Sequence, residues 1–170
     1  MKNKIICAVT GRSYEEIGNG RTEIYSENAD IKFSIREKID KLVRNGVTDF
    51  LCHAEYGFPF WAAEYIINLR ENRKEQGLSP INLCVIRIYE GQPFAWSYDI
   101  QDRYFSVLDD ADFERYFSNT LGKDSYRKCE KLMIDCCHFL LTDLRDSFAV
   151  QYAELHAKPI VFCEDVLVGV

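Results

Sequence analysis

Residues 50–70 read FLCHAEYGFPFWAAEYIINLR, a short apolar run, a loop and a helical pattern in direct succession. The apolar run ends at His53, the loop carries Glu55 and Tyr56, and the helical pattern begins at Pro59. Proline is well accommodated in the first turn of a helix. A short buried strand that leads into a helix is the repeating unit of α/β proteins. The stretch therefore predicts one strand–helix unit, whose loop is either a ligand loop or a packed turn.

The same succession recurs along the chain. Near-continuous apolar strands that alternate with helices imply a parallel sheet buried on both faces. We therefore expect an α/β fold, a Rossmann-like three-layer sandwich with a mainly parallel sheet. No linker or repeat marks a second unit, so residues 1–170 are expected to form a single domain. The expected strands are 4–10, 48–53, 81–88, 112–118, 137–142 and 160–163, and the expected helices are 29–45, 59–76, 98–111, 124–135 and 146–157.

The charge of the chain argues against a nucleic-acid surface. The 170 residues carry a formal net charge of −6, whereas proteins that bind nucleic acid cluster Lys and Arg on one face. The apolar run near the N-terminus is too short for a signal peptide, and no run approaches the roughly 18 apolar residues of a membrane span. We expect a cytoplasmic protein with no membrane partner.

The cysteines predict neither disulfides nor a metal site. There are seven, and no CxxC pair occurs among them. Histidines at helical i,i+4 spacing are also missing, so no metal is expected, and no cofactor beyond a possible nucleotide-derived ligand. The cysteines within apolar runs are expected to be small buried hydrophobes in a reducing compartment; these are Cys7, Cys52, Cys84, Cys136, Cys137 and Cys163.

Ligands of open parallel sheets bind beyond the carboxyl ends of the strands. Four segments of this chain follow expected strands and carry polar or aromatic residues, and the helix after His53 adds two more candidates. The candidate ligand-binding residues are Thr10, Gly11, Arg12, Ser13, His53, Glu55, Tyr56, Gly57, Trp61, Glu64, Trp96, Asp143 and Ser147.

Two kinds of charged group stand out among these candidates. Arg12 with Ser13 would hold a phosphate or carboxylate, unless Arg12 is a solvated side chain beside a plain turn. Glu55 and Glu64 are the carboxylates best placed for catalysis or for accepting ribose hydroxyls, unless they lie on a loop top and a helix face. Catalytic residues therefore stay unassigned, with Glu55 and Glu64 as weak candidates.

The ring-bearing candidates also have two interpretations. Trp61 and Trp96 would stack on a base or sugar, or else pack in the core. His53 would titrate near neutral pH, or else be hydrogen-bonded at a strand end.

Several stretches in order resemble one family. AVTGRS, GFPFWAAEYIINL, QPFAWSYDIQDRYFSVLDDAD and KLMIDCCHFLLTDLRDSFAVQYAELHAKPI are similar to the YpsA-like branch of the SLOG superfamily, from about residue 5 to 163. That superfamily includes the DNA-processing protein DprA and the LOG proteins. The resemblance implies a Rossmann-like fold with a nucleotide or nucleotide-derived ligand at the strand ends. In LOG enzymes the related fold hydrolyses the N-glycosidic bond of a nucleoside monophosphate.

This chain departs from the family in its phosphate-binding loops. Only Gly57 remains in the loop after the second strand, and no Gly-Gly-Thr turn follows the strand expected at 137–142. A phosphate cradle needs converging backbone N–H groups, often with glycine. Asp143 and Asp146 would also repel a phosphate.

Three functions remain open from the sequence. The first is binding of a nucleotide or nucleotide-derived ligand for sensing or regulation, without clear catalysis. The second is an N-glycosidase-like hydrolase of a nucleotide, in which Glu55 or Glu64 stabilises an oxocarbenium-like centre. The third is an interaction module whose aromatic residues form a homo-oligomer interface.

Overall fold

The fold of this protein is described from a computed structural model, which covers residues 3–18, 23 and 28–163. The strands are β1 (Ile6–Val9), β2 (Asp49–Cys52), β3 (Asn82–Tyr89), β4 (Phe113–Ser118), β5 (Phe139–Thr142) and β6 (Ile160–Phe162). The helices are α1 (Tyr14–Gly18), α2 (Ala29–Arg44), α3 (Phe58–Glu75), the short 3-10 helix η1 (Gln92–Ala95), α4 (Tyr98–Asp110), α5 (Ser125–Cys136) and α6 (Phe148–Leu155).

The six strands form one sheet in the order β4-β3-β2-β1-β5-β6, and every neighbouring pair is parallel. Val9 at the end of β1 is level with Cys52 of β2 and Leu141 of β5, so their carboxyl ends lie at one edge. The chain moves outward from β1 to β4 and then returns to the other side of β1. The predicted α/β sandwich with a parallel sheet is confirmed, and the order reverses between β1 and β5.

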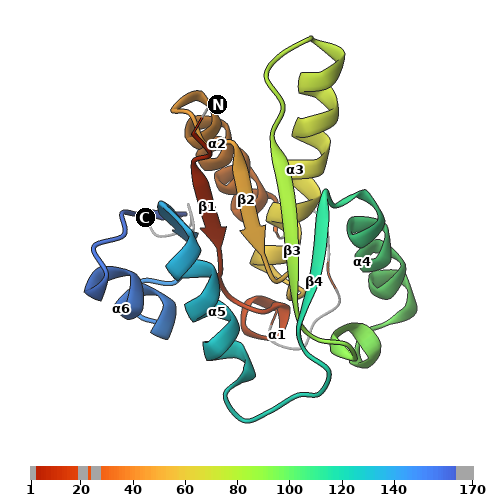
Figure 1. Ribbon diagram of the computed structural model, residues 1–170. Coiled ribbons are helices and arrows are strands. Elements are labelled where there is room, and N and C mark those ends of the chain that lie inside the picture. The colour runs from red at the N-terminus through yellow and green to blue at the C-terminus, as the bar shows by residue number, and fades with distance from the viewer. Residues whose placement is uncertain (1–2, 19–22, 24–27, 164–170) are drawn as a thin grey trace, which may run out of the picture.

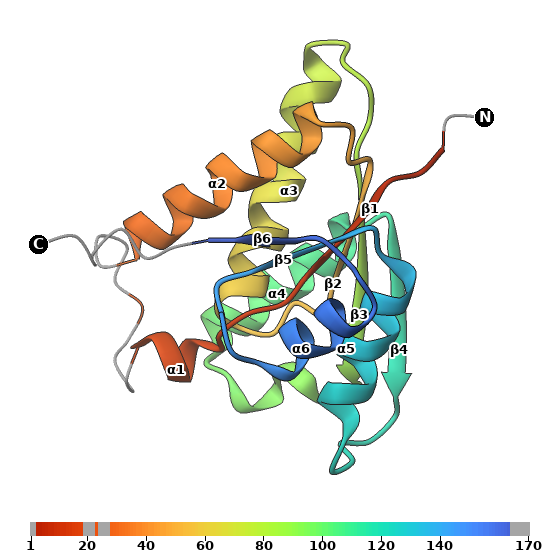
Figure 2. The ribbon, with the colours of Figure 1, turned by 90° about the vertical axis from the view of Figure 1, so that its left-hand side faces the viewer.

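Helices cover both faces of the sheet (Figures 1 and 2). On one face α2 packs against α3 and α3 against α4, and on the other α5 packs against α6. The central strand shows why both faces must be covered. Cys7 and Val9 of β1 belong to the core under α2 and α3, whereas Ala8 belongs to the core under α5 and α6. Each of the three is fully buried, as the continuous apolar run of this strand predicts.

The expected elements are all present, with ends shifted by up to about two residues. Two short helices were not expected, α1 after β1 and η1 after β3. Both follow strands at the carboxyl edge of the sheet, where their residues help to line a cavity. No helix within the described residues is long and apolar enough to cross a bilayer.

The expectation that the cysteines of apolar runs are buried is wrong for one of them. Cys136 is exposed, because it lies at the C-terminal end of α5 on the side away from the core, and Cys84 is half-buried. The thiols are all free, and those that are buried as expected are Cys7, Cys52, Cys137 and Cys163.

Candidate functional site

A cavity of about 540 Å³ lies at the carboxyl ends of the strands, and we call it the strand-end crevice. The loops after β1, β2, β3 and β5 line it, together with α1, η1 and α5. Seven of the predicted site residues are in its wall: Gly11, Ser13, His53, Glu55, Tyr56, Trp96 and Ser147. The wall also contains Tyr14, Glu15, Glu16, Tyr89, Gln92, Ala95, Tyr126, Glu130 and Leu144.

Glu55 is held in this crevice by a hydrogen bond from a buried glutamine. The side-chain amide of Gln92 donates to its Oε2 at 3.2 Å and to the backbone oxygen of His53 at 2.9 Å. Gln92 is itself buried, and its Oε1 accepts from the backbone N–H of Ile88 at 2.9 Å. Burial raises the pKa of Glu55 to about 7, although hydrogen bonds from Tyr126 and Gln92 partly oppose the shift. Glu55 therefore exchanges a proton near neutral pH.

The other ionisable carboxyl groups of the crevice increase its acidity. Glu130 lies on α5, and burial raises its pKa to about 7 as well. Glu15 and Glu16 are exposed on α1, at the rim. None of the described residues that line the crevice is Lys or Arg. The cavity is therefore acidic and has no basic side chain in its described wall to bind an anion.

Aromatic rings form much of the remaining wall. The Tyr56 ring lies 4.8 Å from that of Tyr14 and 5.9 Å from that of Trp96, measured between centroids. Tyr89 and Tyr126 add rings from β3 and α5. Flat aromatic faces suit a heterocyclic base, which stacks on them with little dependence on base identity.

His53 is a structural histidine at the end of β2. It is 3% exposed, and its Nδ1 accepts from the backbone N–H of Glu55 at 3.1 Å. Burial lowers its pKa to about 4, so the ring is neutral at physiological pH. Of the two alternatives, His53 is therefore the histidine that is hydrogen-bonded at a strand end, and it does not titrate near neutral pH.

The charged residues expected at the ends of β1 and β5 bind each other. Asp143 Oδ1 accepts from the backbone N–H of Arg12 at 2.9 Å, and its Oδ2 accepts from Arg12 Nε at 2.8 Å. The Asp143 carboxylate is 2% exposed. Thr10, which is also buried, donates its backbone N–H to Leu141. Thr10, Arg12 and Asp143 thus join the two strand ends and are not part of the crevice wall.

Gly57 allows two backbone segments to approach closely. Its φ is +134°, and a Cβ built there would lie 2.5 Å from the Arg12 carbonyl oxygen and 2.6 Å from the Tyr14 nitrogen. The neighbour that requires glycine is therefore the backbone of residues 12–14. The sequence had instead placed Gly57 among the candidate ligand-binding residues.

The N-terminus of α3 has little capacity left for an anion. The Phe58 N–H donates to the Arg12 carbonyl at 3.0 Å, and the Phe60 N–H donates to the Glu55 carbonyl at 3.2 Å. Pro59 has no N–H to offer. The first-turn donors that commonly hold a phosphate in related folds are therefore already used.

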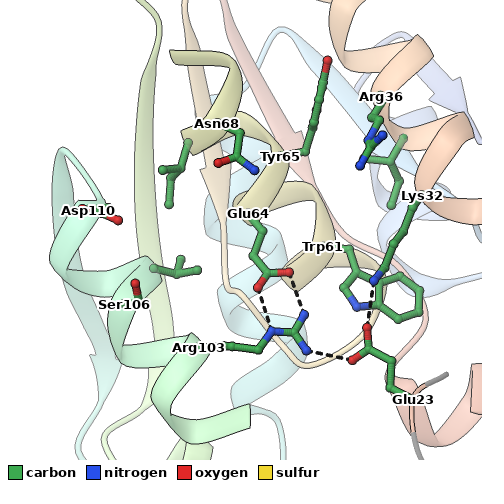
Figure 3. Close-up of a pocket in the computed structure, with 13 residues that line it drawn as sticks. Glu23, Lys32, Arg36, Trp61, Glu64, Tyr65, Asn68, Arg103, Ser106 and Asp110 are labelled. Atoms are coloured by element: carbon green, nitrogen blue, oxygen red, sulfur yellow. Dashed lines mark hydrogen bonds and ion pairs between the residues drawn. The ribbon is translucent and has the colours of Figure 1, made fainter. Parts of the chain in front are cut away.

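Trp61 and Glu64 line a different cavity, which we call the helix pocket. It measures about 580 Å³ and lies between α2, α3 and α4 (Figure 3). Arg103 donates Nε and Nη2 to the two oxygens of Glu64 at 2.9 and 2.8 Å, and its Nη1 binds Glu23 at 2.9 Å. Lys32 also binds Glu23 and lies over the Trp61 ring. The two residues therefore line the helix pocket and not the crevice, although the sequence grouped them with the crevice residues.

Some crevice residues were missed by sequence reasoning. Gln92 was passed over as part of a loop, and Glu15 and Glu16 belong to the unexpected helix α1. Tyr126 and Glu130 are four residues apart on α5, a spacing that puts them on one helical face. That spacing was the available signal, but it does not say which way the face points. Within the described residues, no cluster of three His, Cys, Asp or Glu side chains could hold a metal ion.

Comparisons with known proteins find one matching family model and several similar proteins. The family model with the short name YpsA, described as YspA SLOG family, matches residues 7–157. The UPF0398 protein BH1768 of Halalkalibacterium halodurans is 29% identical over 112 residues, which are 64% of this chain and 54% of that protein. The UPF0398 protein SERP1017 of Staphylococcus epidermidis is 25% identical over 118 residues, 66% of this chain and 60% of that protein. The matched regions thus span little more than half of these curated relatives.

Proposed function

The chain belongs to the YpsA family of SLOG proteins, and from this membership we propose that its strand-end crevice binds a nucleotide-derived small ligand for sensing or regulation. The observation that carries the proposal is Glu55, half-buried among aromatic rings where the carboxyl ends of the central strands meet. In open parallel sheets this is where ligands bind, beside the point where the strand order reverses. A carboxylate there accepts hydrogen bonds from ribose hydroxyls or from the amino group of a base.

The geometry also suggests how such a ligand lies. Gln92 fixes Glu55 from the side of β3, so the carboxyl group is positioned before a ligand arrives. The rings of Tyr56 and Trp96 are held by contacts with neighbouring rings, and Trp96 also packs edge-on against Tyr104 at 5.3 Å. Rings that are ordered in advance lose little entropy on binding. We therefore expect the base to stack on this wall and the ribose to face Glu55.

Thermal unfolding with added nucleosides, nucleotides, dinucleotides and ADP-ribose tests the proposal. At least one of them should raise Tm, because a ligand that binds only the folded state stabilises it. Glu55→Gln should abolish or sharply reduce the shift, and Trp96→Ala should weaken it. Glu75→Gln is the matched control, since Glu75 is exposed at the far end of α3. Failure of every compound to raise Tm would reject the proposal.

A second candidate function is N-glycosidase-like hydrolysis of a nucleotide. It is favoured by the pKa of Glu55, because a carboxyl group near 7 is suited to general acid or base catalysis at neutral pH. Glu64 is not suited to this role, since both of its oxygens bind Arg103 in the helix pocket. Release of free base from nucleoside monophosphates, followed by chromatography, tests this candidate. Hydrolysis that persists undiminished in Glu55→Gln would rule out Glu55 as its catalytic group.

A further inference from the structure

We propose that the strand-end crevice selects a nucleoside without a phosphate, and prefers one whose base carries a positive charge. This inference rests on the proposed function, since it names the class of ligand for the same crevice. It runs against the expectation that the family resemblance raises, which is a ligand bound through its phosphate.

The first support is the sign of the charge around the cavity. Four carboxyl groups line it from three directions: Glu15 and Glu16 from α1, Glu55 from the end of β2, and Glu130 from α5. No Lys or Arg accompanies them in the described part of the wall. A phosphate dianion placed there would be repelled by each ionised carboxylate, at roughly 1 kcal/mol per unit-charge pair at close range even in high dielectric. Several such pairs lower affinity by about tenfold or more.

The second support is that the usual phosphate anchors are occupied. The first turn of α3 donates its available N–H groups to the carbonyls of Arg12 and Glu55, as described above. The Arg12 guanidinium binds Asp143. At α6, the Ser147 hydroxyl accepts from the Val150 N–H. The N–H groups at the start of α3 and the Nε–H of Arg12, which would offset the repulsion, are therefore already used within the fold.

The third support is the combination of rings with carboxyl groups. Tyr56, Tyr89, Trp96 and Tyr126 line the same cavity as Glu55 and Glu130. The face of an aromatic ring attracts a cation, and by about 0.5–2 kcal/mol according to how far the site is desolvated. Burial raises the pKa of Glu55 and of Glu130 to about 7, and a bound cation would favour the ionised form of both groups. A cationic base would be attracted by both kinds of group, whereas a neutral base is attracted mainly by the rings.

Four matched compounds separate base charge from phosphate charge: adenosine, 1-methyladenosine, and the 5′-monophosphate of each. The 1-methyl compounds carry a positive charge on the ring at neutral pH. Isothermal titration at pH 7.5 and low salt should show 1-methyladenosine binding about threefold to tenfold more tightly than adenosine. Each monophosphate should bind about tenfold more weakly than its nucleoside.

The outcomes distinguish the two proposals. A monophosphate that binds as tightly as its nucleoside, or more tightly, overturns this inference and leaves the proposed function standing. Equal affinity of adenosine and 1-methyladenosine overturns the preference for a charged base. Absence of binding by all four compounds, together with absence of any Tm shift in the wider screen, rejects the proposed function itself.

One charge reversal tests the physical cause. Glu15→Lys changes an exposed rim residue, so the fold should be retained, and it should bring the affinity for adenosine 5′-monophosphate to within about threefold of that for adenosine. Glu75→Lys makes the same change in net charge at the opposite end of α3, about 26 Å along the helix from its first residue. This control should leave the ratio of the two affinities, for adenosine and for its 5′-monophosphate, unaltered. If both variants strengthen binding of the monophosphate equally, the effect comes from net charge and not from the charge of the crevice.

Discussion

Replacing Gly57 with alanine should be among the most damaging single-methyl changes in this protein. Gly57 precedes α3 and has φ +134° and ψ −137°, a region that residues with a Cβ rarely occupy. Forcing such a conformation on alanine costs about 1–3 kcal/mol. The three atoms nearest to the added Cβ, at 2.5, 2.6 and 2.7 Å, all belong to the backbone of residues 12–14. Backbone cannot rotate away as a side chain can.

The clash adds to the conformational cost. To make room, residues 12–14 must move and weaken the bonds from the Phe58 N–H to the Arg12 carbonyl and from the Tyr14 N–H to the Tyr56 carbonyl. Each bond contributes about 0.5–1.5 kcal/mol. The two costs together predict that Gly57→Ala lowers the free energy of unfolding by about 4 kcal/mol. In a chain of 170 residues this corresponds to a fall in Tm of about 8–16 °C.

Urea unfolding followed by circular dichroism measures this loss, and Gly77→Ala is the matched control. Gly77 also has a positive φ, +66°, but nothing lies within 4 Å of the position that its Cβ would occupy. It should therefore cost only the conformational part, about 1 kcal/mol. If Gly57→Ala destabilises the protein no more than Gly77→Ala does, the close approach of the two backbone segments is not as described here.

Three further changes follow from the structure. Because burial raises the pKa of Glu55 from 4.5 to about 7, stability from this group falls as the pH rises through that range. Glu55→Gln should therefore raise the free energy of unfolding above that of the native protein by up to about 3 kcal/mol at pH 8, and by almost nothing at pH 4. Urea unfolding at the two pH values measures this difference. An equal effect at both pH values would contradict the raised pKa. Asp143→Ala should lower the free energy of unfolding by about 2–4 kcal/mol in the same assay, because it removes two buried oxygen atoms that accept hydrogen bonds from Arg12. A loss of less than about 0.5 kcal/mol would argue against that ion pair. Iodoacetamide should label the exposed Cys136 in the folded protein and spare Cys52, whose pKa burial raises to about 12; mass spectrometry that finds Cys52 labelled first would refute the core described here.

The stretch around α3 shows how far reasoning from the sequence extends. The run after β2, the loop and Pro59 predicted a strand–helix unit, and the unit is present. The spacing of Trp61 and Glu64 also puts both on one face of α3, as a helix requires. Which way that face points depends on how far α3 is rotated about its axis when it packs on the sheet and against α2 and α4. The rotation turns both side chains toward the helix pocket. Their spacing in the sequence could not show which of the two cavities they line.

The crevice illustrates the same limit over longer distances. Glu55 was a candidate because it follows a strand, and strand ends are visible in the sequence. Glu130 and Tyr126 reach the same cavity from a helix about 70 residues further along the chain. The contact of Arg12 with Asp143 joins residues 131 positions apart and changes an expected anion ligand into a structural ion pair.

The sequence was enough to establish the strands, the helices and the parallel sheet, because hydrophobic periodicity and turn residues act over a few neighbours along the chain. It also predicted a candidate site at the carboxyl edge of that sheet, where the strand-end crevice lies. The tertiary structure alone determined which side chains share the crevice, which charges neutralise each other, and that the space beside Gly57 is filled by backbone. Those outcomes depend on the packing of segments far apart in sequence, which no local pattern encodes.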